Sequence, residues 1–363
     1  MNKDNKNNDI SRAFGAQAAF CAAQDAPLMA ALMTAAKADF DAGKVVNFLL
    51  SGWSGNPVDD ALPLRLAGFL HFQALSGAAP ELATFYASCS GRFEAGREAE
   101  IWGLAQIQLH ENENAVRQFL RSAPQTNETG RAAILLAGFS QIAQMTGLPL
   151  RLREIGSSAG LNLLFDFYDY KLGAMHWGSG QSALEIESDW QGTPPQLQAE
   201  IAIADRRGCD LFPVDLRQTP ERLRLQSYIW GDMTQRRSRL LQALQVADAA
   251  DAMGKLPEID RADAARWVAS QVMQRPSGQT TVLFHSITWQ YLDVSQRMAI
   301  EAAMEQAGET ATAQNPLAWL RMDVDRGHQK PVWEYDLWTG GAPIKRRLAT
   351  CHAHGTIAVF GDA

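Results

Sequence analysis

The sequence has few cysteines, and they form no pattern. Its 363 residues include four cysteines, at Cys21, Cys89, Cys209 and Cys351, and no two of them form a CxxC pair. This spacing argues against a disulfide framework and against a zinc knuckle. It favours reduced thiols, and therefore a cytoplasmic protein.

Long apolar runs and an excess of positive charge are also lacking. No run of about 18 apolar residues occurs, so we expect no membrane-spanning helix. No apolar segment of the signal-peptide type follows the polar start of the chain. The net charge of −7 argues against nucleic acid, because phosphate binding needs a dense basic surface. We therefore expect neither a nucleic-acid partner nor a membrane partner.

The length and the apolar periodicity predict two domains. A chain of 363 residues with 46% apolar and 20% charged residues is too long for one compact core and has an ordinary globular composition. We expect residues 1–9 to be a disordered tail. Apolar residues recur at three- and four-residue spacing in the next part, as at Leu62, Leu66 and Phe69. This predicts an all-helical N-terminal domain over residues 10–148.

The character of the sequence changes at Pro149, where short β-like stretches begin to alternate with helical ones. Such alternation predicts an α/β domain over residues 149–363, with a mostly parallel sheet covered on both faces. The end of the chain differs, because Trp333–Thr339 and Arg347–Phe360 read as two antiparallel strands joined by a glycine turn. The expected inner strands are 150–155, 201–204, 256–260, 281–286 and 316–322, and the expected helices are 159–167, 218–227, 232–250, 263–274 and 294–307.

A glycine turn follows the first expected strand. It reads Glu154-Ile-Gly156-Ser157-Ser158-Ala159-Gly160 and leads into an apolar helix. Glycines let the backbone approach a ligand closely, and free amides at a helix start favour an electronegative group. Taken alone, the turn is equally typical of α/β proteins that use it only to begin a helix. The dinucleotide pattern G-x-G-x-x-G fits less well, which disfavours a nicotinamide-dependent oxidoreductase.

This turn resembles the first motif of class I S-adenosylmethionine-dependent methyltransferases, acidic-x-Gly-x-Gly-x-Gly, with Ser158 in place of the middle glycine. The resemblance implies a Rossmann-like sheet, parallel with a C-terminal antiparallel hairpin, and S-adenosylmethionine as the cofactor. In that family the acidic residue helps to bind the methionine end of the cofactor. The cofactor-binding residues that it implies are Glu154, Gly156, Ser157, Ser158, Ala159, Gly160, Asn162, Asp210, Asp263 and Ala264.

Two later acidic residues extend the resemblance. Asp210 lies in a segment similar to the end of the second methyltransferase strand, where a carboxylate accepts hydrogen bonds from the ribose hydroxyls. The alternative is a capped turn that ends at Pro213. Asp263-Ala264 resembles the Asp-Ala pair after the third strand, which meets the adenine amino group. The alternative is a plain helix N-cap at Asp263.

The spacing between these motifs is long. About 50 residues separate Gly160 from Asp210, where roughly 20 to 25 are usual for such folds. The excess, at about 168–198, predicts an inserted hairpin or a lid over the site.

Other polar residues are candidates for the substrate side. His285 ends an expected strand and could act as a general base, or be a hydrogen-bonded structural histidine. His352 and His354 lack a third ligand at a metal-site spacing, so we expect no metal. For the remaining candidates the alternatives are helix capping and a simple ion pair between positions 232 and 236. The candidate substrate-binding residues are Asn127, Glu128, Arg131, Trp230, Asp232, Arg236 and Ser286.

The chain from about residue 10 onward also resembles an uncharacterised bacterial family, domain-of-unknown-function family 2332. The residues that carry this resemblance are Thr126–Arg131, Pro149–Leu163, Tyr228–Asp232 with Arg236, Leu283–Ser286 and His352–Gly355.

The leading hypothesis for the function is a methyltransferase that acts on a small molecule. The alternative is a catalytically silent binding or regulatory module, motivated by Ser158 and by the lack of a substrate motif. Whether the chain forms a homodimer stays open.

Overall fold

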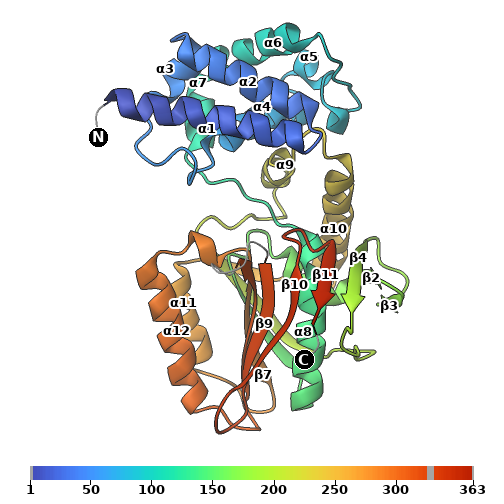
Figure 1. Ribbon diagram of the computed structural model, residues 1–363. Helices are drawn as coiled ribbons and strands as arrows, with labels where there is room; N and C mark the ends of the chain where they lie inside the picture. The colour runs from blue at the N-terminus through green and yellow to red at the C-terminus, as the bar shows by residue number, and fades with distance from the viewer. Residues whose placement is uncertain (1–2, 325–330, 362–363) are drawn as a thin grey trace. The chain divides into compact units, whose positions relative to one another are not determined.

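The computed structural model describes residues 3–324 and 331–361 and divides the chain into two compact units (Figure 1). Unit 1 comprises the chain up to Thr126 together with Asp215–Ser238, and unit 2 comprises Asn127–Val214 and the chain from Arg239 onward. This division differs from the domain boundary at residue 148 that we expect from the sequence. Residues 127–148 belong to unit 2 because their helix packs on its sheet, and residues 215–238 return to unit 1.

Unit 1 is built from helices around an apolar core. Four of these helices carry proline in the first turn, where the missing N–H costs no intrahelical bond. The first helix begins at Lys3, inside the stretch expected to be a tail, and residues 1–2 lie outside the described residues. The helices are α1 (Lys3–Ala23), α2 (Pro27–Asp41), α3 (Val45–Leu50), α4 (Leu62–Leu75), α5 (Pro80–Ala83), η1 (Ala87–Cys89), α6 (Glu98–Glu111), α7 (Glu113–Leu120) and α9 (Thr219–Ser227).

Unit 2 is a mixed α/β structure with a mostly parallel sheet, as the sequence predicts. In the described part of the chain the sheet has eleven strands in the order β3-β2-β4-β11-β10-β9-β8-β7-β1-β5-β6. The strands are β1 (Leu150–Ile155), β2 (Asp169–Leu172), β3 (Met175–Trp177), β4 (Glu185–Gly192), β5 (Ile203–Asp210), β6 (Glu258–Arg261), β7 (Thr280–Ser286), β8 (Leu317–Val324), β9 (Pro331–Trp338), β10 (Ile344–Cys351) and β11 (Ile357–Phe360).

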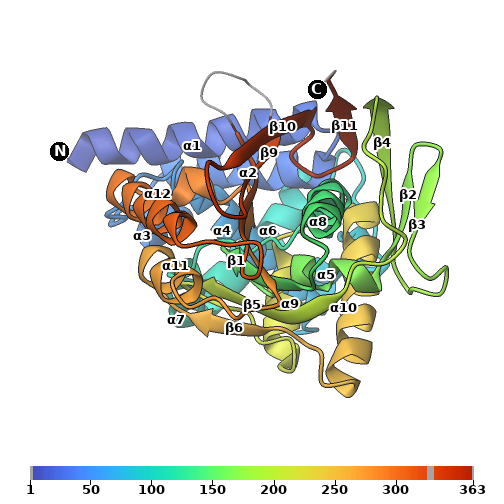
Figure 2. The same ribbon diagram turned by 90° about the horizontal axis from the view of Figure 1, so that it is seen from below.

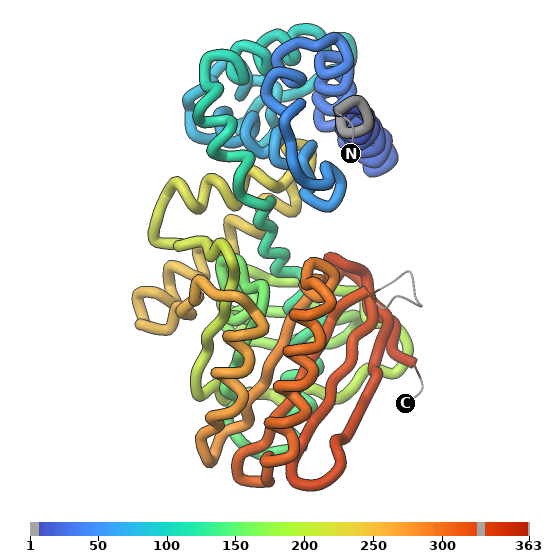
Figure 3. Tube along the Cα trace, turned by 90° about the vertical axis from the view of Figure 1, so that its left-hand side faces the viewer, coloured from blue at the N-terminus to red at the C-terminus, as the bar shows by residue number. Residues whose placement is uncertain are grey.

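Helices cover both faces of this sheet (Figure 2). On one face α11 (Ala264–Val272) and α12 (Val294–Glu309) lie side by side, as Figure 3 also shows. On the other face α8 (Ala132–Thr146) packs against β8 and β9. All seven residues of β7 are buried, which is expected for a central parallel strand. The remaining helices are α10 (Thr234–Ala252), which begins in unit 1, and the short η2 (Thr129–Arg131), η3 (Leu161–Phe167) and η4 (Trp289–Tyr291).

The end of the chain forms a meander instead of a single hairpin. β9 and β10 pair antiparallel around the glycine turn, as predicted. The expected second strand, 347–360, is broken, because residues 352–356 turn and β11 is a separate strand. β11 then pairs parallel with β4.

The segment 168–198 lengthens the sheet. β2 and β3 form the expected hairpin, and β4 joins them to β11. These residues therefore extend the sheet beyond β11, with β3 as the edge strand. Of the two expectations for this segment, the structure has the hairpin and not a lid over the strand ends.

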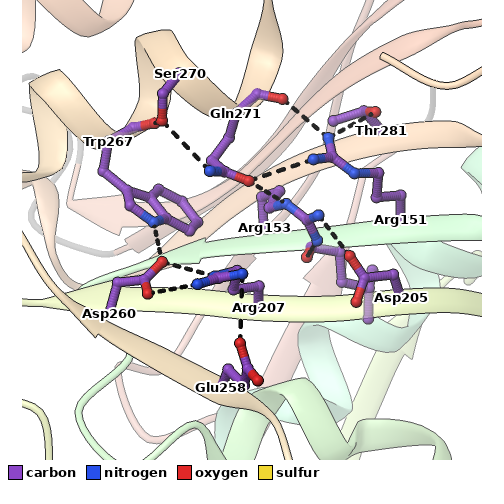
Figure 4. A network of polar contacts seen from close by, with 11 residues as sticks. Arg151, Arg153, Asp205, Arg207, Glu258, Asp260, Trp267, Ser270, Gln271 and Thr281 are labelled. Atoms are coloured by element: carbon purple, nitrogen blue, oxygen red, sulfur yellow. Dashed lines mark hydrogen bonds and ion pairs between the residues drawn. The ribbon is translucent and has the colours of Figure 1, made fainter. Parts of the chain in front are cut away.

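A polar network fixes α11 to the first strands of the sheet (Figure 4). Arg153 of β1 is buried and donates to Asp205 at 2.5 Å and to the Gln271 side chain at 2.8 Å. Arg207 of β5 binds both oxygens of Asp260, at 2.7 and 2.8 Å. These pairs join β1, β5, β6 and α11, and the Arg207 guanidinium lowers the pKa of Asp260.

None of the helices in the described residues combines the length and the apolar character needed to cross a bilayer.

The packing of α8 on the sheet leaves no room for a side chain at Gly138. A Cβ there would lie 2.4 Å from Leu320 and 3.1 Å from Trp333, both fully buried. We expect Gly138→Ala to destabilise the protein by about 1–3 kcal/mol, measured by thermal unfolding. Gly103→Ala is the matched control, because its Cβ meets nothing within 4 Å in α6, and we expect it to stabilise by about 0.5–1 kcal/mol. Equal effects of the two changes would contradict this account of the packing.

Candidate functional site

The turn after β1 has a left-handed backbone at three alternate residues. φ is +68° at Gly156, +53° at Ser158 and +74° at Gly160. Both glycines also face close neighbours, since a Cβ would lie 2.5 Å from Thr288 at Gly156 and 2.7 Å from Ile259 at Gly160. Ser158 therefore adopts a conformation that glycine adopts more easily, at a residue where the methyltransferase motif has glycine.

Hydrogen bonds hold this turn against the end of β5. The Ser157 N–H donates to the Cys209 carbonyl at 3.1 Å, and the Val214 N–H donates to the Ser158 carbonyl at 3.1 Å. Asp210 accepts from the Ser158 N–H at 3.0 Å and from the Phe212 N–H at 2.9 Å. Asp210, which the sequence resemblance predicts to bind ribose, thus also fixes the conformation of the turn.

Glu154 is a buried carboxyl group at the end of β1, with 2% of its surface exposed. Burial raises its pKa well above the ordinary value, and the Asn162 side chain and the charge of Arg131 oppose this only in part. Its Oε2 atom has no hydrogen-bond partner among the described residues. Burial at the site therefore disfavours the charged form of this carboxyl group.

Two further buried polar atoms lie on the same turn and its following helix. Ser158 Oγ and Asn162 Oδ1 have no hydrogen-bond partner within the described parts of the chain. Leaving a buried polar atom unpaired costs about 1–3 kcal/mol, so such atoms call for an explanation. Two acceptor oxygens and one hydroxyl suit a ligand group that carries several N–H donors.

Asn127 and Arg131 connect this turn to more distant segments of unit 2. Asn127 Oδ1 accepts from the Leu161 N–H at 2.8 Å, at the start of η3. Arg131 donates to the Ser286 carbonyl and to the Ala353 carbonyl, both at 3.0 Å. Four of the segments that carry the family resemblance, at 126–131, 149–163, 283–286 and 352–355, therefore meet in one place.

Glu128 stabilises the segment 126–131, which carries Asn127 and Arg131. It is buried, accepts from the Gly130 N–H at 3.3 Å and forms an ion pair with Arg239 at 3.0 Å. The capping interpretation of Glu128 is thus present in the structure. Gly130 lies so close to the 352–355 turn that a Cβ would meet the His354 carbonyl at 2.3 Å.

The end of β7 carries a second strained residue. Ile287 has φ +52°, an unusual value for a β-branched side chain, and it lies between Ser286 and Thr288. Asp323 holds this turn, because its Oδ1 accepts from the N–H groups of Thr288 and Trp289, at 2.8 and 3.0 Å. Left-handed residues on two neighbouring turns are the kind of strain that is found at functional sites.

His285 lies on the opposite face of the sheet from Glu154. Glu154 pairs with Phe284, so these two side chains share the face that α8 covers, and His285 points to the other face. The imidazole is 1% exposed, with Nδ1 bonded to Asp323 and Nε2 accepting from the Trp319 indole N–H at 3.1 Å. Both nitrogens are engaged, so the structural alternative is present in the structure, and a role as a general base stays a prediction.

Asp263 is the N-cap of α11, and Ala264 is the first residue of that helix. The carboxylate accepts from the Arg266 N–H at 3.1 Å and from the Gln296 side chain at 2.6 Å. The capping alternative is therefore present, and a contact with adenine stays a prediction.

Trp230, Asp232 and Arg236 belong to unit 1. Asp232 accepts from the N–H groups of Leu28 and Met29, both at 3.1 Å, at the start of α2. Trp230 packs edge-on against Phe20, and Arg236 contacts the Met233 sulfur. Their observed contacts are therefore with the helical unit, and a role in binding substrate stays a prediction.

Sequence reasoning did not single out Asp323 and Thr288, which shape the site from β8 and from the end of β7. Asp323 directly follows the expected strand 316–322 and lies near the end of β8, and this position was the available signal, because polar residues that bind ligands collect at the carboxyl edge of a sheet. His352 and His354 lie on the 352–356 turn, and no group of three or more His, Cys, Asp or Glu that could hold a metal occurs in the described residues.

The chain belongs to the family described as "Uncharacterized protein conserved in bacteria (DUF2332)", whose model matches residues 11–359. This confirms the family resemblance stated from the sequence. Neither the curated proteins nor the solved structures contain a match.

The buried carboxyl of Glu154 predicts a pH-dependent stability difference. Because its pKa is raised in the folded state, its contribution to stability is complete below the unfolded pKa of about 4.5 and is lost as the pH rises toward the folded pKa. We expect Glu154→Gln to raise the unfolding temperature at pH 8 and to change it little at pH 4. The gain in the free energy of unfolding should be about 1.4 kcal/mol for each unit of pKa difference between the folded and unfolded states.

Glu301→Gln, an exposed position on α12, is the control and should show no such pH dependence. A stability difference between wild type and Glu154→Gln that stays constant from pH 4 to pH 8 would refute the account of Glu154.

The left-handed backbone at Ser158 predicts a stabilising substitution. We expect Ser158→Gly to raise the free energy of unfolding by about 0.5–2 kcal/mol, since glycine adopts this conformation without the Cβ contact. Ser157→Ala should instead lower it by about 1 kcal/mol, because it removes the hydroxyl bond to the Glu154 carbonyl at 2.8 Å. Denaturant unfolding measures both, and a destabilised Ser158→Gly protein would show that the turn carries no strain.

Proposed function

We propose that unit 2 binds S-adenosylmethionine at the turn after β1 and transfers its methyl group to a small-molecule acceptor. The observation that carries the proposal is the buried Glu154 carboxyl, whose Oε2 is unpaired, beside the unpaired Ser158 Oγ and Asn162 Oδ1. Two acceptors and a hydroxyl on one turn suit the ammonium group of an amino acid, which offers three N–H donors.

The residues present fit this cofactor. Glu154, Ser158 and Asn162 would hold the ammonium end of its methionine part, and Asp210 stands at the end of β5 where the resemblance puts a ribose-binding carboxylate. When bound, the cofactor supplies a methyl group on a positively charged sulfur. Deprotonation of Glu154 on binding a cation would give a charged hydrogen bond inside the protein, which is among the stronger kinds.

The order of the parallel strands also supports a nucleotide-type site at this place. Numbered along the chain, β6, β5, β1, β7 and β8 are the third, second, first, fourth and fifth of these strands. In such open sheets ligands bind beyond the carboxyl ends of the strands, where the strand order reverses. Here that point lies between β1 and β7, which the Glu154 turn and the Ile287 turn follow.

The other polar residues of the site have positioning roles in this proposal. Asn127 fixes the start of η3, and Arg131 ties the end of β7 to the 352–356 turn. Methyl transfer depends on the alignment of the acceptor with the methyl group, so fixed strand ends contribute directly. Glu128 and Ser286 support Arg131, and their contact with an acceptor stays part of the proposal.

A second candidate function is a binding module without turnover. The observation that favours it is His285, whose two ring nitrogens are both engaged and whose side chain lies on the far face of the sheet. This candidate predicts that the cofactor binds and that no acceptor is methylated.

Isothermal titration of the purified full-length protein with S-adenosylmethionine and S-adenosylhomocysteine tests the proposal. We expect both to bind wild type. Glu154→Gln should weaken binding about 10- to 100-fold, because a charged hydrogen bond contributes about 1.5–3 kcal/mol. Glu301→Gln should bind like wild type.

The absence of binding at millimolar ligand would refute the proposal. Where both compounds bind, release of S-adenosylhomocysteine during incubation with small-molecule acceptors separates the methyltransferase from the silent module.

A further inference from the structure

A cavity of unit 1 lies between α1 and the loop that joins α3 to α4. Its volume is about 450 Å³, within the range of about 300–1,000 Å³ that is usual for small-molecule sites. The apolar part of its lining comes from one helix residue, Ile10, and from three loop residues, Trp53, Pro57 and Val58. The charged part of its lining, among the described residues, consists of one acidic and one basic side chain of α1, Asp9 and Arg12.

The aromatic wall of this cavity is held in one orientation. The Trp53 indole N–H donates to Asp60 Oδ2 at 2.7 Å, and the Arg65 guanidinium lies 5.2 Å from the centroid of the indole ring. Arg65 is only 7% exposed and donates to the carbonyl oxygens of Asp60 and Leu120, at 2.6 and 2.7 Å. An apolar group that enters the cavity therefore meets an aromatic ring that is already in place.

The loop backbone beside Trp53 is fixed as well. Asn56 Oδ1 accepts from the Val58 N–H at 2.9 Å. A Cβ on Gly55 would lie 1.9 Å from Asp60 Oδ2, so the loop closes tightly on the carboxylate that holds Trp53. A wall that keeps its shape loses little conformational entropy when a ligand binds, and this favours binding.

Asp9 and Arg12 bring opposite charges to one side of the cavity. Arg12 Nη1 lies 3.8 Å from Asp9 Oδ1, which is close enough for an ion pair and too long for a hydrogen bond. The Arg12 side chain is 70% exposed and that of Asp9 is 37% exposed, and such surface pairs contribute little to stability. A ligand with both an ammonium and a carboxylate group would give each side chain a charged hydrogen bond that the pair itself lacks.

We propose that this cavity binds a free amino acid with an apolar side chain. The ammonium group donates to Asp9, the carboxylate accepts from the Arg12 guanidinium, and the apolar side chain lies among Ile10, Trp53 and Pro57. An amino acid in neutral solution carries this combination of two opposite charges and an apolar body. The proposal concerns unit 1 alone and does not depend on cofactor binding by unit 2.

Isothermal titration of the full-length protein with L-phenylalanine and two truncated analogues tests the proposal. The first analogue, 2-phenylethylamine, lacks the carboxylate, and the second, 3-phenylpropionate, lacks the ammonium group. Arg12→Gln and Asp9→Asn each remove one charge from a side chain that is not buried, so both variants should fold. Arg121→Gln is the matched control, because Arg121 is an exposed arginine of unit 1 that does not line the cavity.

We expect L-phenylalanine to bind wild type and Arg121→Gln equally and to bind Arg12→Gln and Asp9→Asn about 10-fold or more weakly. The analogues should show which charge each residue recognises. Arg12→Gln should leave the affinity for 2-phenylethylamine unchanged, and Asp9→Asn should leave the affinity for 3-phenylpropionate unchanged. A general structural effect of either substitution would lower the affinity for all three compounds. Where an analogue binds too weakly to measure, the ratios for L-phenylalanine decide.

The absence of L-phenylalanine binding at millimolar concentration, or equal binding by wild type, Arg12→Gln and Asp9→Asn, would overturn the proposal. Binding that is lost in Glu154→Gln and kept in both of these variants would place the amino acid at the turn after β1 and would also overturn it. Benzyl alcohol carries the ring without either charge. If it binds as tightly as L-phenylalanine, the cavity accepts a neutral ring, and the assignment to an amino acid is wrong.

Discussion

The short turn at residues 156–160 holds the carboxyl ends of two strands and the start of a helix in one arrangement. It is bonded to β5 through Cys209 and Asp210 and to the loop after β5 through Val214. Asn127, in the segment before α8, accepts from the N–H of Leu161, the residue that follows the turn. Gly156 faces the turn after β7 with no room for a side chain. The places of β1, β5, β7 and η3 at this edge of the sheet therefore depend on the left-handed backbone of the turn.

This arrangement has an energetic cost in the free protein. A carboxyl group is buried at Glu154, and its Oε2 and two polar atoms nearby lack partners within the described residues. Ser158 and Ile287 also have strained backbones. Evolved cores rarely keep such features together unless the site uses them. A ligand with an ammonium group would pair the unpaired atoms and stabilise the charged form of Glu154, and so accounts for them together.

The strands with apolar alternation or β-branched runs, such as β1, β7 and β8, could be predicted from the sequence to within a few residues. β5 could be predicted only at its start, because Asp205, Arg206 and Arg207 make it look like a loop. The partners of their ion pairs come from other strands and helices. The glycine turn and its acidic neighbours were visible as a motif. The face on which His285 lies depends on its register with Glu154 across β1 and β7, which the sequence does not contain.

Proton release on ligand binding tests the central claim most directly. Titration calorimetry with S-adenosylhomocysteine in buffers of different ionisation enthalpy, at a pH between the ordinary and the raised pKa of Glu154, measures how many protons leave the protein. The account predicts that close to one more proton leaves wild type than leaves Glu154→Gln, because the bound ammonium group replaces the proton on the carboxyl. Binding with the same proton release from both proteins would contradict it.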